Sequence, residues 1–217
     1  MTKTLRSLSL GLIILAGGRS TRMGRDKTAL PWHDTDLLTD LLLRSQAYPF
    51  TERLLSINRP YESSHLPAKL ARTVRLVIDN YPDCGPLGGI EAALYSGGQC
   101  DFYLVLSVDL PFYDFAPVPD WVKLLRRQPN LQAIIPRTEN GQDQPLAALY
   151  SRQLLPAITD HLQKGITACA ICIKTCRQPM SMKPSVRPYI SISIRLKPMR
   201  LPKAATPTTA ARYPSSP

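Results

Sequence analysis

The feature that most constrains this 217-residue chain is an unbroken apolar run near its start, followed at once by a loop of glycines and cations. The run is Ser9-Leu10-Gly11-Leu12-Ile13-Ile14-Leu15, and it is continuous rather than alternating. A strand that helices cover on both faces has this pattern, whereas a strand with one solvated face alternates apolar and polar residues. The run therefore predicts a central strand of a parallel sheet.

The rest of the chain alternates between strand and helix patterns. Helical spacing predicts helices over 37–48, 89–96 and 119–127, short apolar runs predict strands over 53–57, 73–78, 102–108 and 132–135, and 145–161 closes the body. Strands that alternate with helices form three-layer sheets, and their ligands bind at the carboxyl ends of the strands. We therefore expect an α/β protein with a three-layer α/β/α, Rossmann-like domain and a mostly parallel central sheet.

The loop after the first strand has the composition of a phosphate-binding segment. Gly17 and Gly18 let backbone amides approach a phosphate chain, and Arg19, Arg22 and Lys27 can neutralise its charge. Neither G-x-x-x-x-G-K-[ST] nor G-x-G-x-x-G is present, and a solvated turn is the alternative. The string L-A-G-G-x-S-x-R-M-G-x-D-K resembles the nucleotidyltransferase signature of the molybdenum cofactor guanylyltransferase family.

A second segment points the same way. Asp79 follows a predicted strand and begins the string D-x-x-P-D-x-G-P-L-G-G, which resembles the base-recognition loop of that family. The Asp79 carboxylate could accept hydrogen bonds from ribose hydroxyls or a purine edge, and Gly85, Gly88 and Gly89 permit a close backbone approach. The alternative is a structural turn rich in Pro and Gly. Related cytidylyltransferases carry L-A-A-G in the first motif, so the resemblance favours guanine over cytosine.

A third segment delivers one carboxylate, Asp109, at the end of the apolar strand 104–108. Mg²⁺ prefers hard oxygen ligands and bridges nucleotide phosphates with few protein contacts. A helix N-cap or a turn aspartate is the alternative interpretation. The family resemblance implies that Asp109 is the metal ligand.

Two further positions follow from the same resemblance. The guanosine-contacting Asn of the family aligns with Ser56, so either this site uses a hydroxyl or Asn58 takes that role. Residues 141–150, which contain Gln144-Pro145-Leu146, resemble the Q-P-L segment on the acceptor side of the family, where the pterin substrate would lie. A surface hairpin is the alternative for this segment.

The resemblance implies an enzyme that uses Mg²⁺ to transfer GMP from GTP to molybdopterin or Mo-molybdopterin. Molybdenum-insertion proteins or apo-molybdoenzymes would be its protein partners. The implied catalytic residues are Arg19, Lys27 and Asp109, with Asp109 as the metal ligand. The implied GTP-binding residues are Leu15, Ala16, Gly17, Gly18, Arg22, Lys27, Ser56, Asn58, Asp79, Gly85, Pro86, Leu87 and Asp109.

Charge separates a body, residues 1–165, from a tail, residues 166–217. The chain has 27 basic and 16 acidic residues, a net charge of +11, but the tail holds nine of the basic residues and none of the acidic ones. The body is therefore close to neutral, and the basic character of the whole chain does not indicate a nucleic-acid or membrane partner. A nucleic-acid-binding protein remains a rival only through the tail, whose deletion should then abolish binding.

The tail departs from the family pattern, which continues through an N-x-N-T-P-E-[DE] stretch. With permitted codons, residues 190–203 can be read in another frame as F-N-I-N-T-P-E-A-Y-E-A-A-K, which restores that motif. We therefore hypothesise a frameshift, by mutation or sequencing error, and a tail that is otherwise mostly disordered. Two rivals stay open: a related nucleotidyltransferase that uses CTP or a sugar phosphate, and a catalytically impaired GTP-binding protein.

The cysteines and the N-terminus indicate a cytoplasmic protein. The chain has five Cys, an odd number for a disulfide framework, and only Cys84 and Cys100 lie in the body. Cys169, Cys172 and Cys176 have no fourth ligand nearby to complete a metal cluster. The first apolar run is too short to span a bilayer, and no signal-peptide cleavage site follows it.

Overall fold

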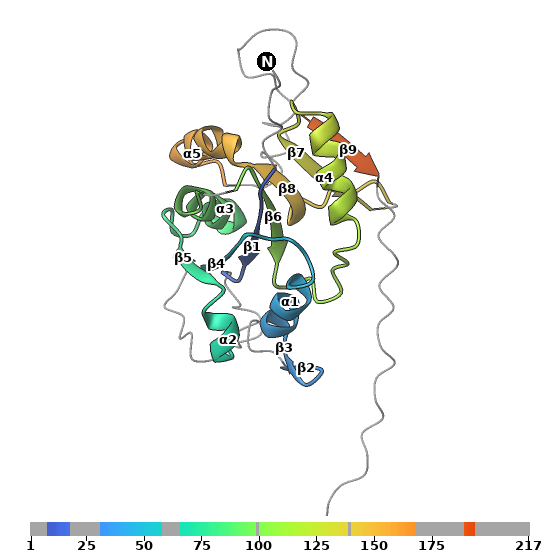
Figure 1. Cartoon of the computed structure of the whole chain (residues 1–217). Coiled ribbons are helices and arrows are strands. Elements are labelled where there is room, and N and C mark those ends of the chain that lie inside the picture. Colours follow the sequence, from blue (N-terminus) through green and yellow to red (C-terminus); the bar gives the residue numbers. More distant parts are fainter. Residues whose placement is uncertain are drawn as a thin grey trace, which may run out of the picture.

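The structure, a computed structural model, describes residues 8–17, 31–57, 66–98, 100–138, 140–167 and 189–193, with backbone alone for 31 and 189–193. Its centre is a seven-stranded sheet in the order β5-β4-β1-β6-β8-β7-β9 (Figure 1). All neighbouring strands are parallel except that β8 runs antiparallel to β6 and β7. The strands are β1 Leu10–Leu15, β4 Glu52–Ile57, β5 Arg75–Ile78, β6 Phe102–Ser107, β7 Ala133–Arg137, β8 Ala147–Ser151 and β9 Tyr189–Ser193.

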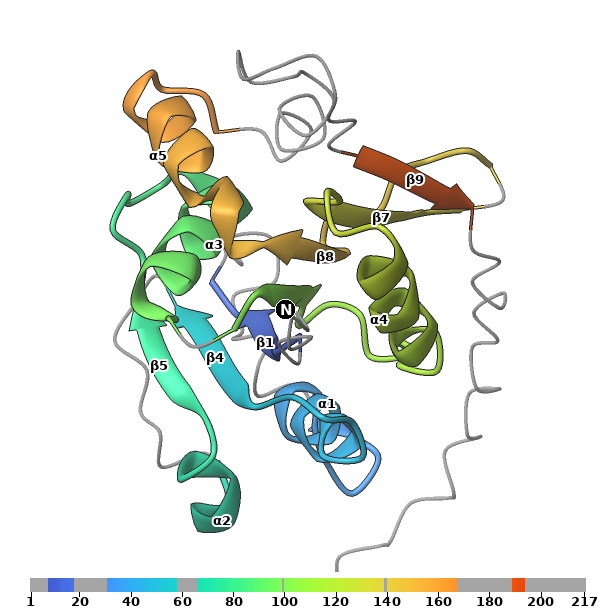
Figure 2. The same cartoon turned by 45° about the horizontal axis from the view of Figure 1, so that its top comes forward.

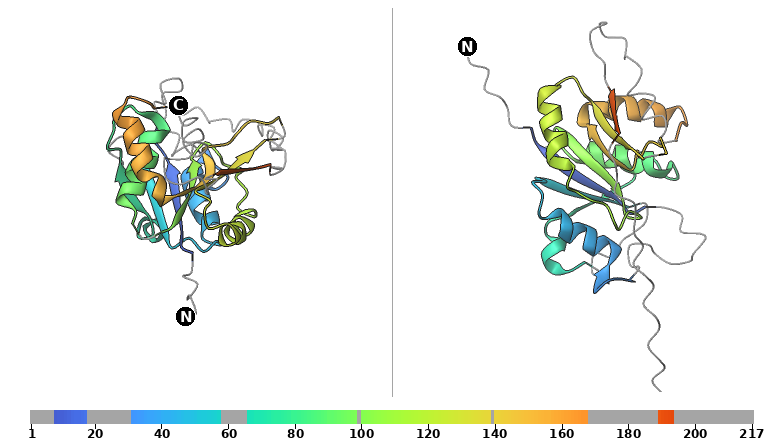
Figure 3. Two further views of the ribbon diagram at one scale, coloured as in Figure 1. Left: turned by 90° about the horizontal axis from the view of Figure 1, so that it is seen from above. Right: turned by 90° about the vertical axis from the view of Figure 1, so that its right-hand side faces the viewer.

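Helices cover both faces of this sheet, as the unbroken apolar run of β1 predicts. Leu12 and Ile14 of β1 point into a core shared with α1, α2 and α4, whereas Ile13 and Leu15 point into a second core shared with α3 and α5. Figures 2 and 3 show these two helix layers on opposite sides of the sheet. The helices are α1 Leu37–Ser45, α2 Ala68–Ala71, α3 Gly85–Ser96, α4 Val118–Arg127 and α5 Leu155–Gln163. The predicted three-layer α/β/α architecture is confirmed.

Several elements differ from the prediction in extent. Helix α3 begins at Gly85 instead of Gly89, so the segment Gly-Pro-Leu-Gly-Gly is helical despite its low helix propensity. Residues 145–161 contain both a strand, β8, and most of a helix, α5, joined by a short 3₁₀ turn at Arg152–Leu154. A hairpin of β2 (Pro31–Trp32) and β3 (Thr35–Asp36) was not predicted, because two residues per strand carry no periodicity.

The hairpin leads directly into α1, and local chemistry fixes that junction. Asp36 is the N-cap of α1, and its carboxylate accepts a hydrogen bond of 2.7 Å from the backbone N–H of Thr39. Such a cap satisfies one of the donors that the first turn of a helix leaves unpaired. The buried face of α1 then follows the predicted spacing, with Leu38, Leu41 and Leu42 almost fully buried.

One stretch of the tail is part of the sheet. β9 pairs in parallel with β7, from Tyr189 opposite Ala133 to Ser193 opposite Arg137. Alternating isoleucine and serine suit a strand, although the composition of the tail predicts mostly disorder there. The proposed boundary at residue 165 and the frameshift stay predictions, and the other residues after 167 lie outside the described part.

Two simpler expectations concern the cysteines and membranes. Cys84 and Cys100 are both free thiols, Cys84 half-buried and Cys100 buried. Within the described ranges, none of the helices has the length and apolar character needed to cross a lipid bilayer.

Candidate functional site

The carboxyl ends of β1, β4, β5 and β6 meet at one edge of the sheet. Leu15, the last residue of β1, lies opposite Ser56 of β4 on one side and Ser107 of β6 on the other. Backbone hydrogen bonds extend both pairings beyond the strands, since the Ala16 N–H donates to the Ser56 carbonyl at 2.9 Å and the Val108 N–H donates to the Leu15 carbonyl at 3.1 Å. The sheet thus brings two candidate segments to the end of β1, and such an edge is where ligands bind in folds of this class.

On the β4 side, Ser56 and Asp79 are in direct contact. The Ser56 hydroxyl donates a hydrogen bond of 3.0 Å to Oδ1 of Asp79, and Ser56 itself is buried. Burial raises the pKa of the half-buried Asp79 carboxyl, and the bond from Ser56 opposes that shift only in part. Ser56 therefore supports the very carboxylate that the sequence singled out for base or ribose recognition.

Helix α3 closes over this pair at Gly89. A Cβ added to Gly89 would overlap the Ser56 hydroxyl and would come within 3.1 Å of Leu15 Cδ2 and 3.4 Å of Asp79 Oδ1. The glycine thus allows the helix to approach the strands, which differs from the expected approach to a ligand. We call Leu15, Ser56, Asp79 and Gly89 the nucleoside region, after the role that the sequence predicts for Asp79.

The segment between Asp79 and α3 forms a turn, which was the alternative interpretation of this string, and its role in base recognition stays a prediction. Asp83 and Gly85 both have positive φ, of 61° and 60°, a backbone conformation that glycine adopts without strain. Gly85 and Pro86 are exposed, whereas Leu87 is only 1% exposed and packs in the α3–α5 core. The side chain of Leu87 is therefore a core residue, and only its backbone could reach a ligand.

Glu91, a buried carboxylate on α3, hydrogen-bonds to Asn80 in the same turn and to Thr159 of α5. Glu91 is 3% exposed, and its two oxygens accept hydrogen bonds from Asn80 Nδ2 at 3.0 Å and from Thr159 Oγ1 of α5 at 3.1 Å. Glu91 lies outside the motifs that the sequence offers as candidate sites. Its position inside an otherwise apolar helix was the available signal, because Glu is rarely buried unless it is hydrogen-bonded.

On the β6 side, Asp109 lies in a turn that follows the strand. Its backbone N–H donates to the Ser107 hydroxyl at 3.4 Å, and the Leu110 N–H donates to the Ser107 carbonyl at 3.1 Å. The Asp109 residue is exposed, in contrast to Asp79. We call residues 107–113 the Asp109 turn.

The side chains near Asp109 determine which kind of divalent cation site could form there. Across the ranges that the structure covers, no three His, Cys, Asp or Glu side chains gather into a metal-binding group. A single exposed carboxylate suits Mg²⁺ that takes its other oxygens from nucleotide phosphates and water. It does not suit a metal held by protein ligands alone.

The predicted acceptor segment adjoins the Asp109 turn. The Ser107 N–H donates to the Leu146 carbonyl at 3.1 Å, so Gln144-Pro145-Leu146 lies against the end of β6. The segment also belongs to a β7–β8 connection, in which Arg137 and Asp143 form an ion pair of 2.8 Å and Gln144 N–H donates to the Pro136 carbonyl at 2.8 Å. The segment thus connects the antiparallel strands β7 and β8, as the hairpin interpretation has it, and its role on the acceptor side stays a prediction.

The other candidate residues belong to the loop after β1 and to the end of β4. Gly18, Arg19, Arg22, Lys27 and Asn58 lie outside the described residues. Ala16 and Gly17, at the end of β1, are half-buried and exposed. The structure therefore groups Leu15, Ser56 and Asp79 on one side of β1 and sets Asp109 on the other.

Comparison with known proteins was made by sequence and by fold. The family model described as a MobA-like NTP transferase domain matches residues 12–172. A probable molybdenum cofactor guanylyltransferase of Methanosarcina mazei is 32% identical over 158 residues, which cover 70% of this chain and 68% of that protein.

Two solved structures show the same fold at low sequence identity. Molybdopterin-guanine dinucleotide biosynthesis protein A from Archaeoglobus fulgidus superposes with a TM-score of 0.58 at 19% identity, covering 76% of this chain and 79% of its own. 2-C-methyl-D-erythritol 4-phosphate cytidylyltransferase from Thermus thermophilus gives 0.57 at 17% identity, with coverages of 80% and 87%. The nucleotidyltransferase fold is confirmed, and it does not by itself distinguish the two chemistries.

Proposed function

Because the chain belongs to the MobA-like NTP transferase domain family, we propose that it transfers GMP from GTP to molybdopterin or Mo-molybdopterin, forming the guanine dinucleotide cofactor and pyrophosphate. That the chain is a nucleotidyltransferase follows from the family. The proposal adds the nucleotide, the acceptor and the residues that act on each.

The observation that carries the choice of nucleotide is the Ser56–Asp79 contact beneath α3. A carboxylate has about four acceptor sites, and the Ser56 hydroxyl occupies one of them on Oδ1. Guanine presents neighbouring N–H donors that match a carboxylate. Asp79 would accept from the base or the ribose, while Leu15, Ala16 and Gly17 would contact the guanosine through the end of β1.

In the proposed reaction, the terminal phosphate oxygen of molybdopterin attacks the α-phosphorus of GTP. A new bond forms between that oxygen and phosphorus as the bond from phosphorus to the β-phosphate oxygen breaks, and pyrophosphate leaves with the electron pair. No covalent enzyme intermediate is needed, so the protein contributes positioning and charge stabilisation.

Asp109 is the proposed ligand of Mg²⁺, which when bound neutralises the charge of the nucleotide phosphates. Arg19, Arg22 and Lys27 would contact the triphosphate from the loop after β1. The pterin would lie beside Gln144-Pro145-Leu146, which the Leu146 carbonyl joins to the end of β6. The cytoplasmic location and the molybdoenzyme or insertion-protein partners remain predictions.

One alternative has an observation in its favour. The cytidylyltransferase of Thermus thermophilus matches this fold as well as the guanylyl-type structure does. A related nucleotidyltransferase that uses CTP or a sugar phosphate is therefore the second candidate.

The direct test is formation of the guanine dinucleotide cofactor from GTP, Mg²⁺ and molybdopterin, analysed by chromatography. This chain is compared with a version whose C-terminus is restored in the other frame, and CTP replaces GTP in a parallel reaction. We expect product from GTP with at least the restored chain. Product from CTP alone would contradict the guanylyl assignment, and activity of the restored chain only would identify this copy as the impaired form.

A further inference from the structure

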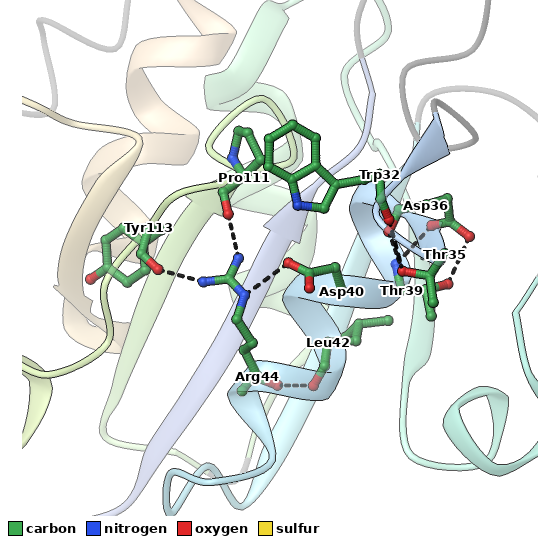
Figure 4. A network of polar contacts seen from close by, with 10 residues as sticks. Trp32, Thr35, Asp36, Thr39, Asp40, Leu42, Arg44, Pro111 and Tyr113 are labelled. Carbon is green, nitrogen blue, oxygen red and sulfur yellow. Dashed lines mark hydrogen bonds and ion pairs between the residues drawn. The ribbon is translucent and has the colours of Figure 1, made fainter. Parts of the chain in front are cut away.

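Arg44 of α1 holds the Asp109 turn from a helix that takes no part in the proposed nucleotide contacts. Its Nη1 donates to the Tyr113 carbonyl and its Nη2 donates to the Pro111 carbonyl, each at 2.6 Å (Figure 4). Both acceptors are backbone atoms in the segment that leads from β6 to α4. One guanidinium therefore fixes two peptide groups of the same turn.

The Arg44 guanidinium is also held by two contacts outside its bonds to the turn, one with Asp40 and one with the Phe115 ring. Nε of Arg44 donates to Asp40 Oδ2 at 2.8 Å, one helical turn earlier on α1, and the guanidinium carbon lies 5.9 Å from the Phe115 ring centroid. The Arg44 side chain is 35% exposed and that of Asp40 is 23% exposed, so water only partly screens the pair. Because the ion pair already orients the planar guanidinium, Arg44 loses little side-chain conformational entropy when it binds the two carbonyls.

The Pro111 and Tyr113 carbonyls, which Arg44 binds, lie in the second of two consecutive turns, and Asp109 lies in the first. The Leu110 N–H donates to the Ser107 carbonyl, and the Tyr113 N–H donates to the Leu110 carbonyl, both at 3.1 Å. Leu110 is thus shared by two consecutive turns. Fixing the second turn at Pro111 and Tyr113 limits the movement of the first, where Asp109 lies.

Aromatic contacts hold the same turn both from the hairpin and from the segment that leads on to α4. Trp32 of β2 packs edge-on against Phe112, with ring centroids 4.9 Å apart at 78°, and Tyr113 packs edge-on against Phe115 at 5.0 Å. Tyr113 is 7% exposed, so its ring is anchored in the core while its carbonyl faces Arg44. The backbone of the turn is therefore fixed, although the Asp109 residue is exposed.

We propose that Arg44 is a positioning residue that sets the Asp109 carboxylate for a divalent cation bound with the nucleotide. The proposal rests on the assignment of Asp109 as the metal ligand. An exposed carboxylate on a loose turn would have to be ordered when the cation binds, and ordering it in advance removes that cost from the binding free energy. Loss of Arg44 should therefore weaken cation binding without altering contacts in the nucleoside region.

Arg53 provides a matched control. It also donates to backbone carbonyls, those of Ser45 at 3.0 Å and Phe50 at 3.2 Å, and its guanidinium carbon lies 5.8 Å from an aromatic ring, that of Phe50. Arg53 is near the start of β4, three positions before Ser56, and its hydrogen bonds go to residues outside the Asp109 turn. Replacing it removes the same kind of interaction at the end of α1, where Ser45 follows Arg44, but removes no hydrogen bond to the Asp109 turn.

The test measures binding of Mn²⁺, as a paramagnetic probe, to the full-length protein in the presence of GTP by electron paramagnetic resonance. The variants are Arg44→Met, Arg44→Lys, Arg53→Met and Asp109→Asn, and GTP affinity in EDTA is measured for each. Thermal unfolding reports whether each variant is folded. Arg44→Lys keeps the charge and serves as the measurable form if Arg44→Met does not fold.

We expect Arg44→Met to weaken Mn²⁺ binding about tenfold, because two charge-assisted hydrogen bonds to the turn are lost. Arg44→Lys should recover part of the affinity, Arg53→Met should bind Mn²⁺ as the wild type does, and GTP affinity in EDTA should be unchanged in both Arg44 variants. If Arg44→Met and Arg53→Met bound Mn²⁺ equally well while Asp109→Asn was defective, the proposed role of Arg44 would be overturned and the metal assignment of Asp109 would stand. Undiminished Mn²⁺ binding in Asp109→Asn would instead overturn the metal assignment in the proposed function.

Discussion

The two sides of the candidate site hold their carboxylates in opposite ways. In the nucleoside region, Asp79 is half-buried, accepts a side-chain hydrogen bond from Ser56 and is covered by α3 at Gly89. In the Asp109 turn, Asp109 is exposed and the backbone is fixed by hydrogen bonds from Arg44 to the Pro111 and Tyr113 carbonyls. One side is shaped by side-chain packing, which suits recognition of a base, and the other by backbone restraint, which leaves room for phosphates, water and a cation.

The largest effect that would test this contrast is on turnover. Asp109→Ala should lower the rate of Mg²⁺-dependent nucleotidyl transfer by about a thousandfold or more, because no second protein carboxylate is proposed to hold the cation. Steady-state kinetics with GTP and molybdopterin measure it. The free energy of unfolding should change by less than about 0.5 kcal/mol, since the residue is exposed.

If Asp109→Ala turned over at the wild-type rate, Asp109 would lose its metal role. If it unfolded the protein, the contrast between a packed side and an open side would be wrong.

A smaller effect is expected where α3 meets the nucleoside region. Gly89→Ala should lower the free energy of unfolding by about 1–3 kcal/mol, because the new methyl group overlaps the Ser56 hydroxyl. The same displacement should weaken GTP binding, even in EDTA. Chemical denaturation and calorimetric titration measure the two effects.

Gly98→Ala is the matched control, since a Cβ there would meet nothing nearer than the Arg152 guanidinium at 4.0 Å. Equal stability of the Gly89 and Gly98 variants would show that α3 can shift without cost, and the packed description of this side would then fail.

The smallest effect concerns the protonation of Asp79. Burial raises its pKa above the ordinary value of 3.8, so the folded state binds this proton more tightly than the unfolded state does. The resulting stability is present below the ordinary pKa and is lost as pH rises through the raised one. Asp79→Asn should therefore raise the free energy of unfolding relative to the wild type at neutral pH and leave it similar in acid.

Ser56→Ala sharpens the same prediction, because the Ser56 hydroxyl bond lowers the pKa of Asp79. Its removal should move the pH range of that stability loss upward, as measured by denaturation across a pH series. A shift toward lower pH would contradict the account of this carboxylate.

Much of the fold could be predicted because its central strands are buried on both faces. β1 and β6 read as continuous apolar runs, and such runs have few other placements in an α/β domain. Helix α3 was only partly predicted, since the glycines near its start argue against a helix, whereas in the structure Gly89 lets the helix pack closely on Ser56 and Asp79. Tertiary contacts override local propensity at that point.

The candidate site also contains residues that local sequence predicts and residues whose roles depend on tertiary contacts. Asp79 and Asp109 could be singled out because a carboxylate at the end of an apolar strand is a local signal. Glu91 and Arg44 could not, because their roles depend on Asn80, Thr159, Pro111 and Tyr113, which other elements bring to them. Asp40 and Arg44 are four residues apart on α1, a spacing that permits an ion pair, but that spacing carries no information about which carbonyls the guanidinium contacts.

The central claim is that Asp79 binds the nucleoside part of GTP and Asp109 binds the cation. The most direct test is one calorimetric measurement of GTP affinity for the wild type, Asp79→Asn and Asp109→Asn, each in Mg²⁺ and in EDTA. Asp79→Asn should weaken GTP binding by a similar factor in both conditions. Asp109→Asn should match the wild type in EDTA and lose only the increase in affinity that Mg²⁺ gives. Wild-type affinity of Asp79→Asn, or a defect of Asp109→Asn that persists in EDTA, would contradict the account.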